Sequence, residues 1–455
     1  MELRTYQKRI AHFLVEHPHA CLSVGMGLGK TAPVLHFLNY TLRLYPHARI
    51  LIVAPKRVAE TVWIQEAEKW NLWNLHSCMV LVSGTKAQKE KLASPEYFIQ
   101  IKVVSRDNVS LFKDQRFDIL IIDELTSFKS WKAARTKAVM GIKADRKIGM
   151  TGTFAPNGII DIYPQLACLD MAGHSDREYY SWIGGNFENI MAGSGQPFKK
   201  YVLRKGVTPQ DVVKPWLKDI ITLTTDDYLT LPPIMENTIP VEMTKGERKA
   251  YDDTVAALHF ELPDTLDFTV DEKAKFAKVQ TLCSGFVYDT DGQAVDAGEA
   301  IRIKDGGAKV MAAVDFCKEC AEAGEPVLMF YNYRETAVWF GELAKEAGLR
   351  IASVRGNSLE WMKKWSAGEL DVLVANPASA GHGLNLQHGG HVVLWLELTY
   401  NYEHFAQANA RLHRMGQQQR VIVNYIVAKD TVDGRVLGAL RNKGKINKEI
   451  EEVTK

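Results

Sequence analysis

The sequence lacks the features that mark several classes of protein. Its 56 Lys and Arg residues are balanced by 54 Asp and Glu residues, so any basic surface for nucleic acid has to be local. No apolar run approaches the roughly 18 residues of a membrane span. The first residues, MELRTYQKRIAHF, contain no apolar segment followed by a small-residue cleavage site. We therefore expect a cytoplasmic protein that is neither secreted nor bound to a membrane.

Cysteine is also scarce, with six in 455 residues. Cys317 and Cys320 form a C-x-x-C pair, but no second Cys or His pair lies nearby to complete four metal ligands. The surrounding segment, VMAAVDFCKECAEAG, is typical of an amphipathic helix. We therefore expect no disulfide framework and no zinc site, and we expect the protein to lie in a reducing compartment.

What the sequence does contain is two series of short apolar runs that alternate with helical patterns. Continuous apolar runs of this kind predict parallel sheets covered on both faces, so the two series predict two α/β lobes. The first series comprises residues 48–55, 78–84, 101–105, 117–124 and 146–153, and the second comprises residues 325–331, 349–354, 370–375, 391–397 and 420–427.

The strand rhythm breaks between Thr153 and Val327. This stretch has helical patterns, a proline-marked link near 226–233, and an expected hairpin around VYDTDGQAV. We therefore divide the chain at 225/226. The first lobe, residues 1–225, has a mainly helical insertion near 155–225, and the second lobe, residues 226–455, has an insertion near 245–305.

The stretch SVGMGLGKT, residues 23–31, follows the apolar strand HACLSV and precedes a helical pattern. Gly27 and Gly29 would let backbone N–H groups approach phosphate at a helix N-terminus. Lys30 would reach the β- and γ-phosphates of a nucleotide, and Thr31 would offer its hydroxyl to Mg²⁺. The usual pattern has a glycine where this chain has Val24, so a structural glycine turn is the alternative for this segment alone.

A carboxylate pair, Asp123 and Glu124, ends the apolar run FDILIIDE. Carboxylates at the carboxyl edge of a buried parallel strand face the same crevice as the loop after the first strand. Asp123 is suited to hold Mg²⁺, and Glu124 to orient and deprotonate an attacking water. Acid pairs after strands are common by chance, but together with the glycine-rich loop they favour nucleotide hydrolysis.

The segment QANARLHRMGQ carries Gln407, Arg411 and Arg414, spaced four and three residues apart. On a helix these residues lie on one face, so both guanidinium groups could enter one anionic cleft. The alternative is an ordinary solvated basic face. An arginine brought to a γ-phosphate accelerates phosphoryl transfer by roughly 10³–10⁵, and arginines from a second lobe would make hydrolysis depend on lobe closure.

Taken in order, these motifs resemble those of the Swi/Snf group of superfamily 2 helicase-like ATPases, a group of double-stranded DNA translocases. The resemblance runs nearly end to end, and RxHRxGQ is its most specific motif. It implies an α/β fold with two RecA-like lobes, an ATP cleft between them, and a DNA-dependent ATPase that uses ATP and Mg²⁺. The matching segments are LRTYQ, MGLGKT, LIVAPKRVAETVW, VVSRDN, DELTSFKS, MTGTFAPN, LMFYNYRET, ANPASAGHGLNLQ and QANARLHRMGQ.

The resemblance also assigns roles to residues. It implies that LRTYQ reads adenine and that most DNA contacts go to phosphate, which positions a duplex without reading its sequence. The implied nucleotide-binding residues are Arg4, Gln7, Gly25, Gly27, Gly29, Lys30, Thr31 and Gln407, and the catalytic ones are Lys30, Asp123, Glu124, Arg411 and Arg414. The implied DNA contacts are Lys56, Arg57, Ser105, Arg106, Thr153, Asn332, Ser379 and His382.

Four residues depart from the pattern of the group. Val24 and Gly25 stand where the loop usually has acidic residues, Thr126 replaces the histidine of the DEAH box, and Phe154 replaces the proline after TGT. That histidine usually links the ATP site to the TGT motif, so the relay between them has to differ. No phosphate, metal or base group is lost, and we expect an active ATPase.

Three functions remain open at this stage. The first is an ATPase that tracks along double-stranded or branched DNA without processive strand separation. The second is a strand-separating helicase on DNA or RNA. The third is a non-enzymatic scaffold or the motor subunit of a nuclease or restriction complex. The compact length, with no separate reader domain, favours a bacterial or phage protein that acts as a monomer, with a nuclease, replication or repair protein as its partner.

Overall fold

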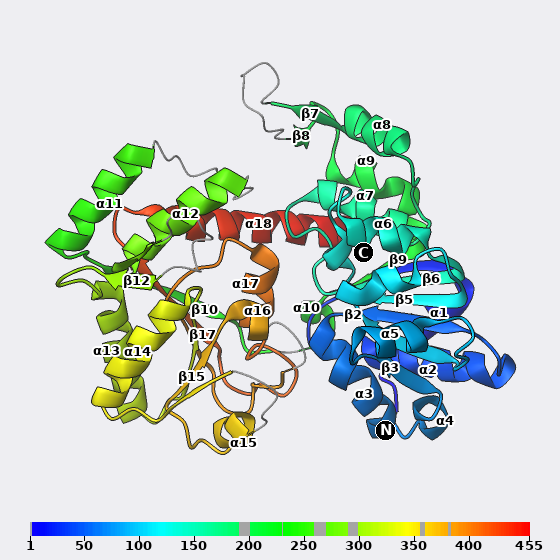
Figure 1. Ribbon diagram of the computed structural model, residues 1–455, viewed down its shortest axis with the longest axis horizontal. Helices are drawn as coiled ribbons and strands as arrows, with labels where there is room; N and C mark the ends of the chain where they lie inside the picture. Colours follow the sequence, from blue (N-terminus) through cyan, green and yellow to red (C-terminus); the bar gives the residue numbers. More distant parts are fainter. Residues whose placement is uncertain are drawn as a thin grey trace. The chain divides into compact units, whose positions relative to one another are not determined.

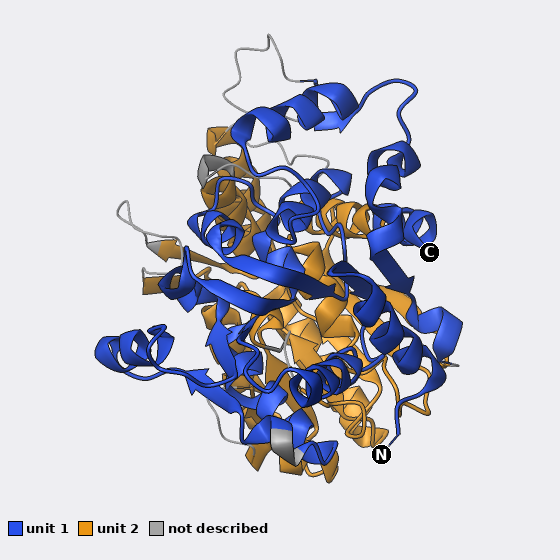
Figure 2. Ribbon diagram, turned by 90° about the vertical axis from the view of Figure 1, so that its right-hand side faces the viewer, with its two compact units in different colours: residues 1–229, 445–455 blue, residues 230–444 orange. Residues whose placement is uncertain are grey.

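The computed structural model describes residues 2–190, 201–229, 231–258, 270–289, 299–354, 360–380 and 384–455. The chain forms two compact units, coloured separately in Figure 2. The first contains Met1–Leu229 and Lys445–Lys455, and the second contains Thr230–Gly444. The sequence analysis placed the division at 225/226 and assigned everything after it to one lobe, whereas residues 445–455 belong to the first unit.

The first unit is built on a seven-stranded sheet in which each strand pair is parallel (Figure 1). The strand order is β3-β4-β2-β5-β6-β1-β9. Its strands are β1 (His19–Val24), β2 (Ile50–Ala54), β3 (Met79–Val82), β4 (Ile101–Ser105), β5 (Arg116–Asp123), β6 (Lys143–Thr151) and β9 (Ile220–Leu223).

Helices cover both faces of this sheet, which explains its continuous apolar strands. Along β2, Ile50 and Ile52 enter the hydrophobic core shared with α1, α2 and α3. Leu51 and Val53 point to the other face and enter the core shared with α6 and α7. The helices before the insertion are α1 (Thr5–Glu16), α2 (Thr31–Leu44), α3 (Trp63–Lys69), α4 (Trp73–His76), α5 (Lys86–Ala93), α6 (Ala134–Gly141) and α7 (Ile162–Cys168).

The insertion in the first unit contains helices and a small hairpin, and it ends earlier than expected. Its elements are α8 (Asp176–Asn186), the antiparallel pair β7 (Phe187–Asn189) and β8 (Tyr201–Leu203), and α9 (Pro209–Val213). The expected insertion near 155–225 included IITL, but these residues form β9 and extend the main sheet beside β1. All four are buried, because pairing with β1 places Ile220 in the core on one face of the sheet and Ile221 and Leu223 in the core on the other. The short helix α10 (Thr225–Tyr228) follows.

The second unit has a six-stranded sheet of order β10-β17-β16-β13-β15-β14, again with parallel pairing throughout. All five apolar runs of the second series form strands. The sequence analysis missed β10, an exposed edge strand that contains Pro240, and proline is tolerated in sheets mainly at such edges. The strands are β10 (Met235–Val241), β13 (Val327–Phe330), β14 (Ile351–Ser353), β15 (Val372–Ala375), β16 (Val392–Trp395) and β17 (Ile422–Ala428).

The helices of the second unit also lie on both faces of its sheet. Val327 and Met329 of β13 enter one core with α13 and α14, and Leu328 and Phe330 enter the other with α15 and α17. The helices are α11 (Lys245–Leu258), α12 (Val270–Cys283), α13 (Ala308–Glu322), α14 (Arg334–Glu346), α15 (Glu360–Ser366), α16 (Pro377–Ala380), α17 (Tyr402–Asn409) and α18 (Val432–Thr454), the last of which ends in the first unit.

Two predictions of secondary structure in this unit, a hairpin and a helix, are confirmed. β11 (Phe286–Asp289) and β12 (Glu299–Arg302) form the expected antiparallel hairpin, although its turn lies outside the described residues. Cys317 and Cys320 lie on α13, the amphipathic helix expected for this segment. As a separate finding, the described residues contain no cluster of three or more His, Cys, Asp or Glu side chains able to hold a metal. None of the described helices is long and apolar enough to cross a membrane.

Candidate active site

The glycine-rich loop connects β1 to α2 at the carboxyl edge of the first sheet. β1 ends at Val24, and α2 begins at Thr31 with Lys30 as its N-cap residue. Gly27 has a φ of 85° and Gly29 a φ of 68°, a left-handed conformation that glycine adopts without the clash of a Cβ atom. The expected strand, loop and helix are therefore in place, with the N-terminus of a 14-residue helix behind the loop.

Two residues of α1 hold this loop from its outer side. The side-chain amide of Gln7 lies 3.2 Å from the carbonyl oxygens of both Leu28 and Gly29 and donates to them. The Tyr6 hydroxyl donates to the Leu28 carbonyl at 3.1 Å. Gln7 is 5% exposed, and its Oε1 accepts from the backbone N–H of Arg4 at 3.0 Å. Both ends of the Gln7 amide are thus engaged with the protein, and adenine recognition by this residue stays a prediction.

A cavity of about 470 Å³ lies beside α1 and supplies another candidate surface for a base. Arg4, Tyr6 and Arg9 of the N-terminal segment line it together with Tyr228 of α10. The rings of Tyr6 and Tyr228 are 4.9 Å apart. Aromatic faces and guanidinium planes both stack well on flat, conjugated rings. The sequence analysis named Arg4 here but missed Tyr228, which is distant in sequence and carries no motif.

Asp123 ends β5 and is 7% exposed. The buried indole of Trp63 donates to its Oδ2 at 3.1 Å. Burial raises the pKa of Asp123, while the positive charge of Lys30 and the Trp63 hydrogen bond act in the opposite direction. The carboxylate of Asp123 is a hard oxygen donor of the kind that Mg²⁺ prefers, and Mg²⁺ takes one or two such ligands besides phosphate and water.

Glu124 connects the acidic box to the TGT motif. It is 9% exposed and has a φ of 59°, a left-handed conformation that is uncommon outside glycine. Its Oε1 accepts from the hydroxyl of Thr126 at 3.2 Å and from the hydroxyl of Thr151 at 3.3 Å. The Thr151 hydroxyl also lies 2.9 Å from the carbonyl oxygen and 3.1 Å from the N–H of Thr153. The hydroxyl groups of Thr126 and Thr151 thus link Glu124 to the TGT motif.

Gly152 brings this motif against the glycine-rich loop. A Cβ atom at Gly152 would lie 2.9 Å from Cγ of Met26 and 3.5 Å from Nζ of Lys30. The absence of a side chain therefore lets the backbone approach both residues. Lys30, Asp123 and Glu124, which the sequence analysis selected as catalytic, gather at one edge of the first sheet.

The predicted DNA contacts of the first unit differ in their exposure. Lys56 is exposed after β2, and Arg57 and Arg106 are partly buried. Arg106 donates to the Ser127 hydroxyl at 2.6 Å, so it is tied to the segment after the acidic box. Ser105 and Thr153 are 7% and 4% exposed, and their polar groups bond within the unit. Among these five residues, only Lys56 is fully at the surface.

The arginines of the second unit do not lie on a helix as predicted. α17 ends at Asn409, so Arg411 and Arg414 lie in the turns that follow. The indole N–H of Trp395 donates to the Asn409 side chain at 2.9 Å, and Gly416 has a φ of 98°, which favours a turn over a continued helix. Both arginines nevertheless converge, because each donates through Nη1 to the carbonyl of Leu384, at 3.2 and 3.0 Å.

Three further predicted residues of this unit lie in different settings. Gln407 is 2% exposed, and its Oε1 has no hydrogen-bond partner within the described part of the chain. Asn332 is partly buried, and its side-chain amide lies 3.4 Å from Oε1 of Gln280. Ser379 is exposed at the end of α16, and His382 lies outside the described residues.

Glu397 organises the segment around Asn332 and was missed from the sequence. It is fully buried, and its Oε2 accepts from the backbone N–H groups of Asn332 and Tyr333, both at 2.9 Å. Its Oε1 accepts from the hydroxyls of Ser284 and Thr336, both at 2.6 Å. The available signal was an acid directly after the apolar run VVLWL, the same pattern that led to Asp123.

Comparison with known proteins agrees with the resemblance. Residues 6–286 match the SNF2-related domain, and residues 308–416 match the helicase conserved C-terminal domain. Protein p41 of Acyrthosiphon pisum secondary endosymbiont phage 1 is 28% identical over 99% of this chain and 98% of its own length. The uncharacterized ATP-dependent helicase YqhH of Bacillus subtilis is 24% identical over 96% of this chain and 77% of its own length.

Two further similarities are more distant. The human DNA annealing helicase and endonuclease ZRANB3 is 23% identical over 98% of this chain, which spans only 40% of the human protein. The structure of the Sulfolobus solfataricus SWI2/SNF2 ATPase core in complex with dsDNA aligns with this chain at 18% sequence identity and a TM-score of 0.44. The alignment covers 100% of this chain and 95% of the Sulfolobus chain.

Proposed function

The chain belongs to the SNF2-related family of helicase-like ATPases, and we propose that it couples ATP hydrolysis to movement along duplex DNA. The family gives two RecA-like α/β lobes and an ATP-dependent activity. The finer proposal names Mg²⁺ as the metal and duplex or branched DNA as the track.

One observation carries this proposal: Glu124 is hydrogen-bonded to the TGT motif at the edge of the sheet where Lys30 and Asp123 lie. Lys30 would bind the β- and γ-phosphates, and Glu124 would orient the attacking water and accept its proton. Asp123 and Thr31 would hold Mg²⁺, which supplies charge neutralisation at the phosphates. Because Thr151 bonds to both Glu124 and Thr153, a change at the γ-phosphate would be transmitted to the segment proposed to contact DNA.

The second unit contributes cations to the same proposal. Arg411 and Arg414 would neutralise the negative charge that develops on the γ-phosphate during transfer. In the structure they share the Leu384 carbonyl as acceptor, so both are preorganised toward one point. Arg414→Ala should lower turnover while leaving ATP affinity nearly unchanged, and unaltered turnover would remove this role.

The five proposed DNA contacts of the first unit, Lys56, Arg57, Ser105, Arg106 and Thr153, are all cations or hydroxyl-bearing residues. Lys56 and Arg57 follow β2, and Arg106 follows β4. Such groups bind phosphate without sequence preference, so binding should weaken steeply with salt as counterions are released. An affinity that is insensitive to salt would contradict this part of the proposal.

The deciding experiment compares triplex displacement with unwinding of a forked duplex, both with ATP and with Lys30→Ala as the inactive control. ATP-dependent displacement of the third strand without separation of the fork would support translocation on intact duplex. Separation of the fork would instead identify a helicase. ATPase activity that rises more with single-stranded RNA than with duplex DNA would overturn the choice of track.

A further inference from the structure

The shoulder of the glycine-rich loop is filled by another segment of the first unit. The N–H of Gly25 donates to the Leu223 carbonyl at 2.8 Å, and the Thr225 hydroxyl donates to the Met26 carbonyl at 3.1 Å. A Cβ atom at Gly25 would lie 2.7 Å from that hydroxyl and 2.9 Å from the Thr225 backbone nitrogen. Val24 is fully buried. An acidic side chain therefore does not fit at Gly25, where the connection from β9 to α10 occupies the space, and at Val24 it would be buried without contact with water.

That connection is in turn bound by the last turn of α18. The buried hydroxyls of Thr222 and Thr454 are hydrogen-bonded at 2.8 Å, and Thr454 also donates to the Ile450 carbonyl at 2.9 Å. At the other end of the connection, Lys455 forms an ion pair with Asp227 at 2.9 Å. The helix end is thus attached on both sides of the residues that touch Gly25 and Met26.

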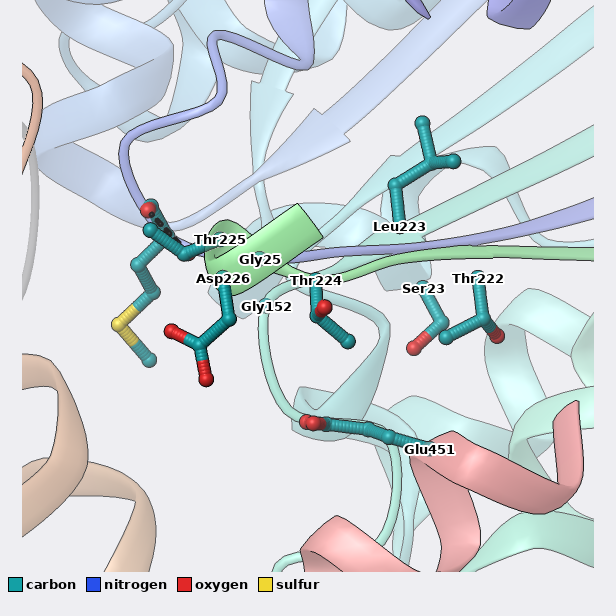
Figure 3. Close-up of a pocket in the computed structure, with 10 residues that line it drawn as sticks. Ser23, Gly25, Gly152, Thr222, Leu223, Thr224, Thr225, Asp226 and Glu451 are labelled. Carbon is teal, nitrogen blue, oxygen red and sulfur yellow. Dashed lines mark hydrogen bonds between the residues drawn. The ribbon is translucent and has the colours of Figure 1, made fainter. Parts of the chain in front are cut away.

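A polar cavity of about 190 Å³ lies between these segments and is shown in Figure 3. The backbone of Gly25, Gly152 and Thr225 forms part of its wall. Two carboxylates reach it from different elements, Asp226 from α10 and Glu451 from α18. The acidic groups absent from the loop itself are therefore present in the wall beside it.

The carboxyl group of Glu451 has a raised pKa in this cavity. Burial raises the pKa of Glu451 from 4.5 to about 7, and the like charges of Asp226 and Asp227 add to the shift. The positive charges of Lys448, on the same helix, and of Lys455, the residue after that helix, act in the opposite direction. The docked helix end therefore favours the neutral form of this carboxyl group.

We propose that the last turn of α18 positions the phosphate-binding loop through the β9–α10 connection, and that ionisation of Glu451 loosens this attachment and weakens ATP binding. The inference rests on the proposed role of the loop as the ATP site. Thr222, Thr225, Thr454 and Glu451 would be positioning residues, which contact the loop or its support and not the nucleotide.

The direction of the pH effect follows from linkage. A carboxyl group whose pKa is higher in the docked state binds its proton more tightly there, so docking is favoured in full below the ordinary value of 4.5. This advantage is lost as the pH rises through about 7, where Glu451 ionises beside Asp226 and Asp227. The KM for ATP should therefore rise between about pH 6 and about pH 8, by about threefold or more.

The experiment measures KM and kcat for ATP across this pH range, and binding of a fluorescent ATP analogue, for wild type, Glu451→Gln and Glu452→Gln. Glu452 is the exposed neighbour on the same helix, so its variant makes the same change of charge without facing the cavity. We expect Glu451→Gln to remove the pH dependence of KM with little change of kcat, and Glu452→Gln to behave as wild type. A pH dependence that survives in Glu451→Gln would overturn the role of this carboxyl group.

A second pair of variants tests the attachment itself. Thr454→Val removes the hydrogen bond to Thr222, whereas Thr454→Ser keeps a hydroxyl at the same place. We expect Thr454→Val to raise KM by about threefold to tenfold, with kcat near that of wild type, and Thr454→Ser to restore KM. Equal KM values in both variants would contradict positioning by this turn. If wild type binds no ATP at any pH, the proposed function itself fails, which separates the two outcomes.

Discussion

In the first unit, β5 ends at Asp123, and in the second, Glu397 lies two residues after the end of β16. Both are buried carboxylates at the carboxyl edge of a parallel sheet. Glu397 accepts four hydrogen bonds, two from hydroxyls and two from backbone N–H groups. Asp123 instead accepts a hydrogen bond from the indole of Trp63 and one from the backbone of Glu124, and it feels the positive charge of Lys30. Burial nevertheless leaves the pKa of Asp123 raised.

The difference distinguishes an acid that stabilises the fold from one suited to bind a ligand. Four donors replace the hydration that Glu397 loses on burial, so its charge is compensated within the unit. The carboxylate of Asp123 has fewer donors to replace its lost hydration. Binding of a cation or of a phosphate-bound metal at Asp123 would therefore be favourable. The carboxyl edge of the sheet thus carries an acid suited to bind a ligand in the first unit and an acid that stabilises the fold in the second.

Among the variants that test this difference, Glu397→Ala should have the largest effect, and the effect should be on stability. The substitution leaves the N–H groups of Asn332 and Tyr333 and two buried hydroxyls without their acceptor. We expect the free energy of unfolding to fall by about 4 kcal/mol, because each unsatisfied buried group costs about 1–3 kcal/mol and some would rebond. Chemical denaturation followed by tryptophan fluorescence measures the change. A loss below about 1 kcal/mol would show that the carboxylate is not a structural centre.

Asp123→Asn should instead lower ATP turnover and leave stability nearly unchanged. This substitution keeps the shape and an acceptor for Trp63 but removes the charge that burial disfavours. ATP turnover should fall by about 10²–10³-fold, as when one preorganised electrostatic group is lost from an active site. Stability should stay within about 1 kcal/mol of wild type, or rise. Denaturation and steady-state ATPase assays on the same preparation separate the two effects, and a large loss of stability would make Asp123 resemble Glu397.

Much of the framework could be predicted because it depends on local composition. Apolar runs that are buried on both faces identify strands without knowledge of their neighbours, and ten such runs form strands as expected. β9 and β10 were missed because each is a short or exposed edge strand whose identity depends on its partner. The C-terminal residues 445–455 were misassigned for a similar reason, since their packing in the first unit has no signal in their own sequence.

The candidate site shows the same limit. The glycine-rich loop with Lys30 and the acidic pair Asp123 and Glu124 could be predicted as site residues because each directly follows an apolar strand. In the structure they meet at one edge of the sheet. The path from Glu124 to Thr151 could not be predicted, since it depends on a hydroxyl reaching across from β6. The turns that hold Arg411 and Arg414 depend on the contact of Asn409 with Trp395, which spacing alone does not reveal.

The smallest and most discriminating change is Trp63→Phe. The substitution keeps a buried aromatic ring but removes the N–H that donates to Asp123 at 3.1 Å. Because that hydrogen bond favours the ionised carboxylate, its loss should raise the pKa of Asp123 further and weaken Mg²⁺ binding. We expect turnover at limiting Mg²⁺ to fall by about tenfold, with part of the loss recovered at saturating Mg²⁺.

Trp70→Phe provides the matched control for this test. Trp70, the C-cap residue of α3, also donates its indole N–H to a carboxylate, but to that of Glu66 at 3.1 Å and not to Asp123. Both variants lose one indole hydrogen bond and similar volume, so a shared loss of stability would appear in both. Only Trp63→Phe should change the dependence of turnover on Mg²⁺. If Trp63→Phe and Trp70→Phe gave the same Mg²⁺ dependence, the Trp63 indole would support the fold and would not influence the pKa of Asp123.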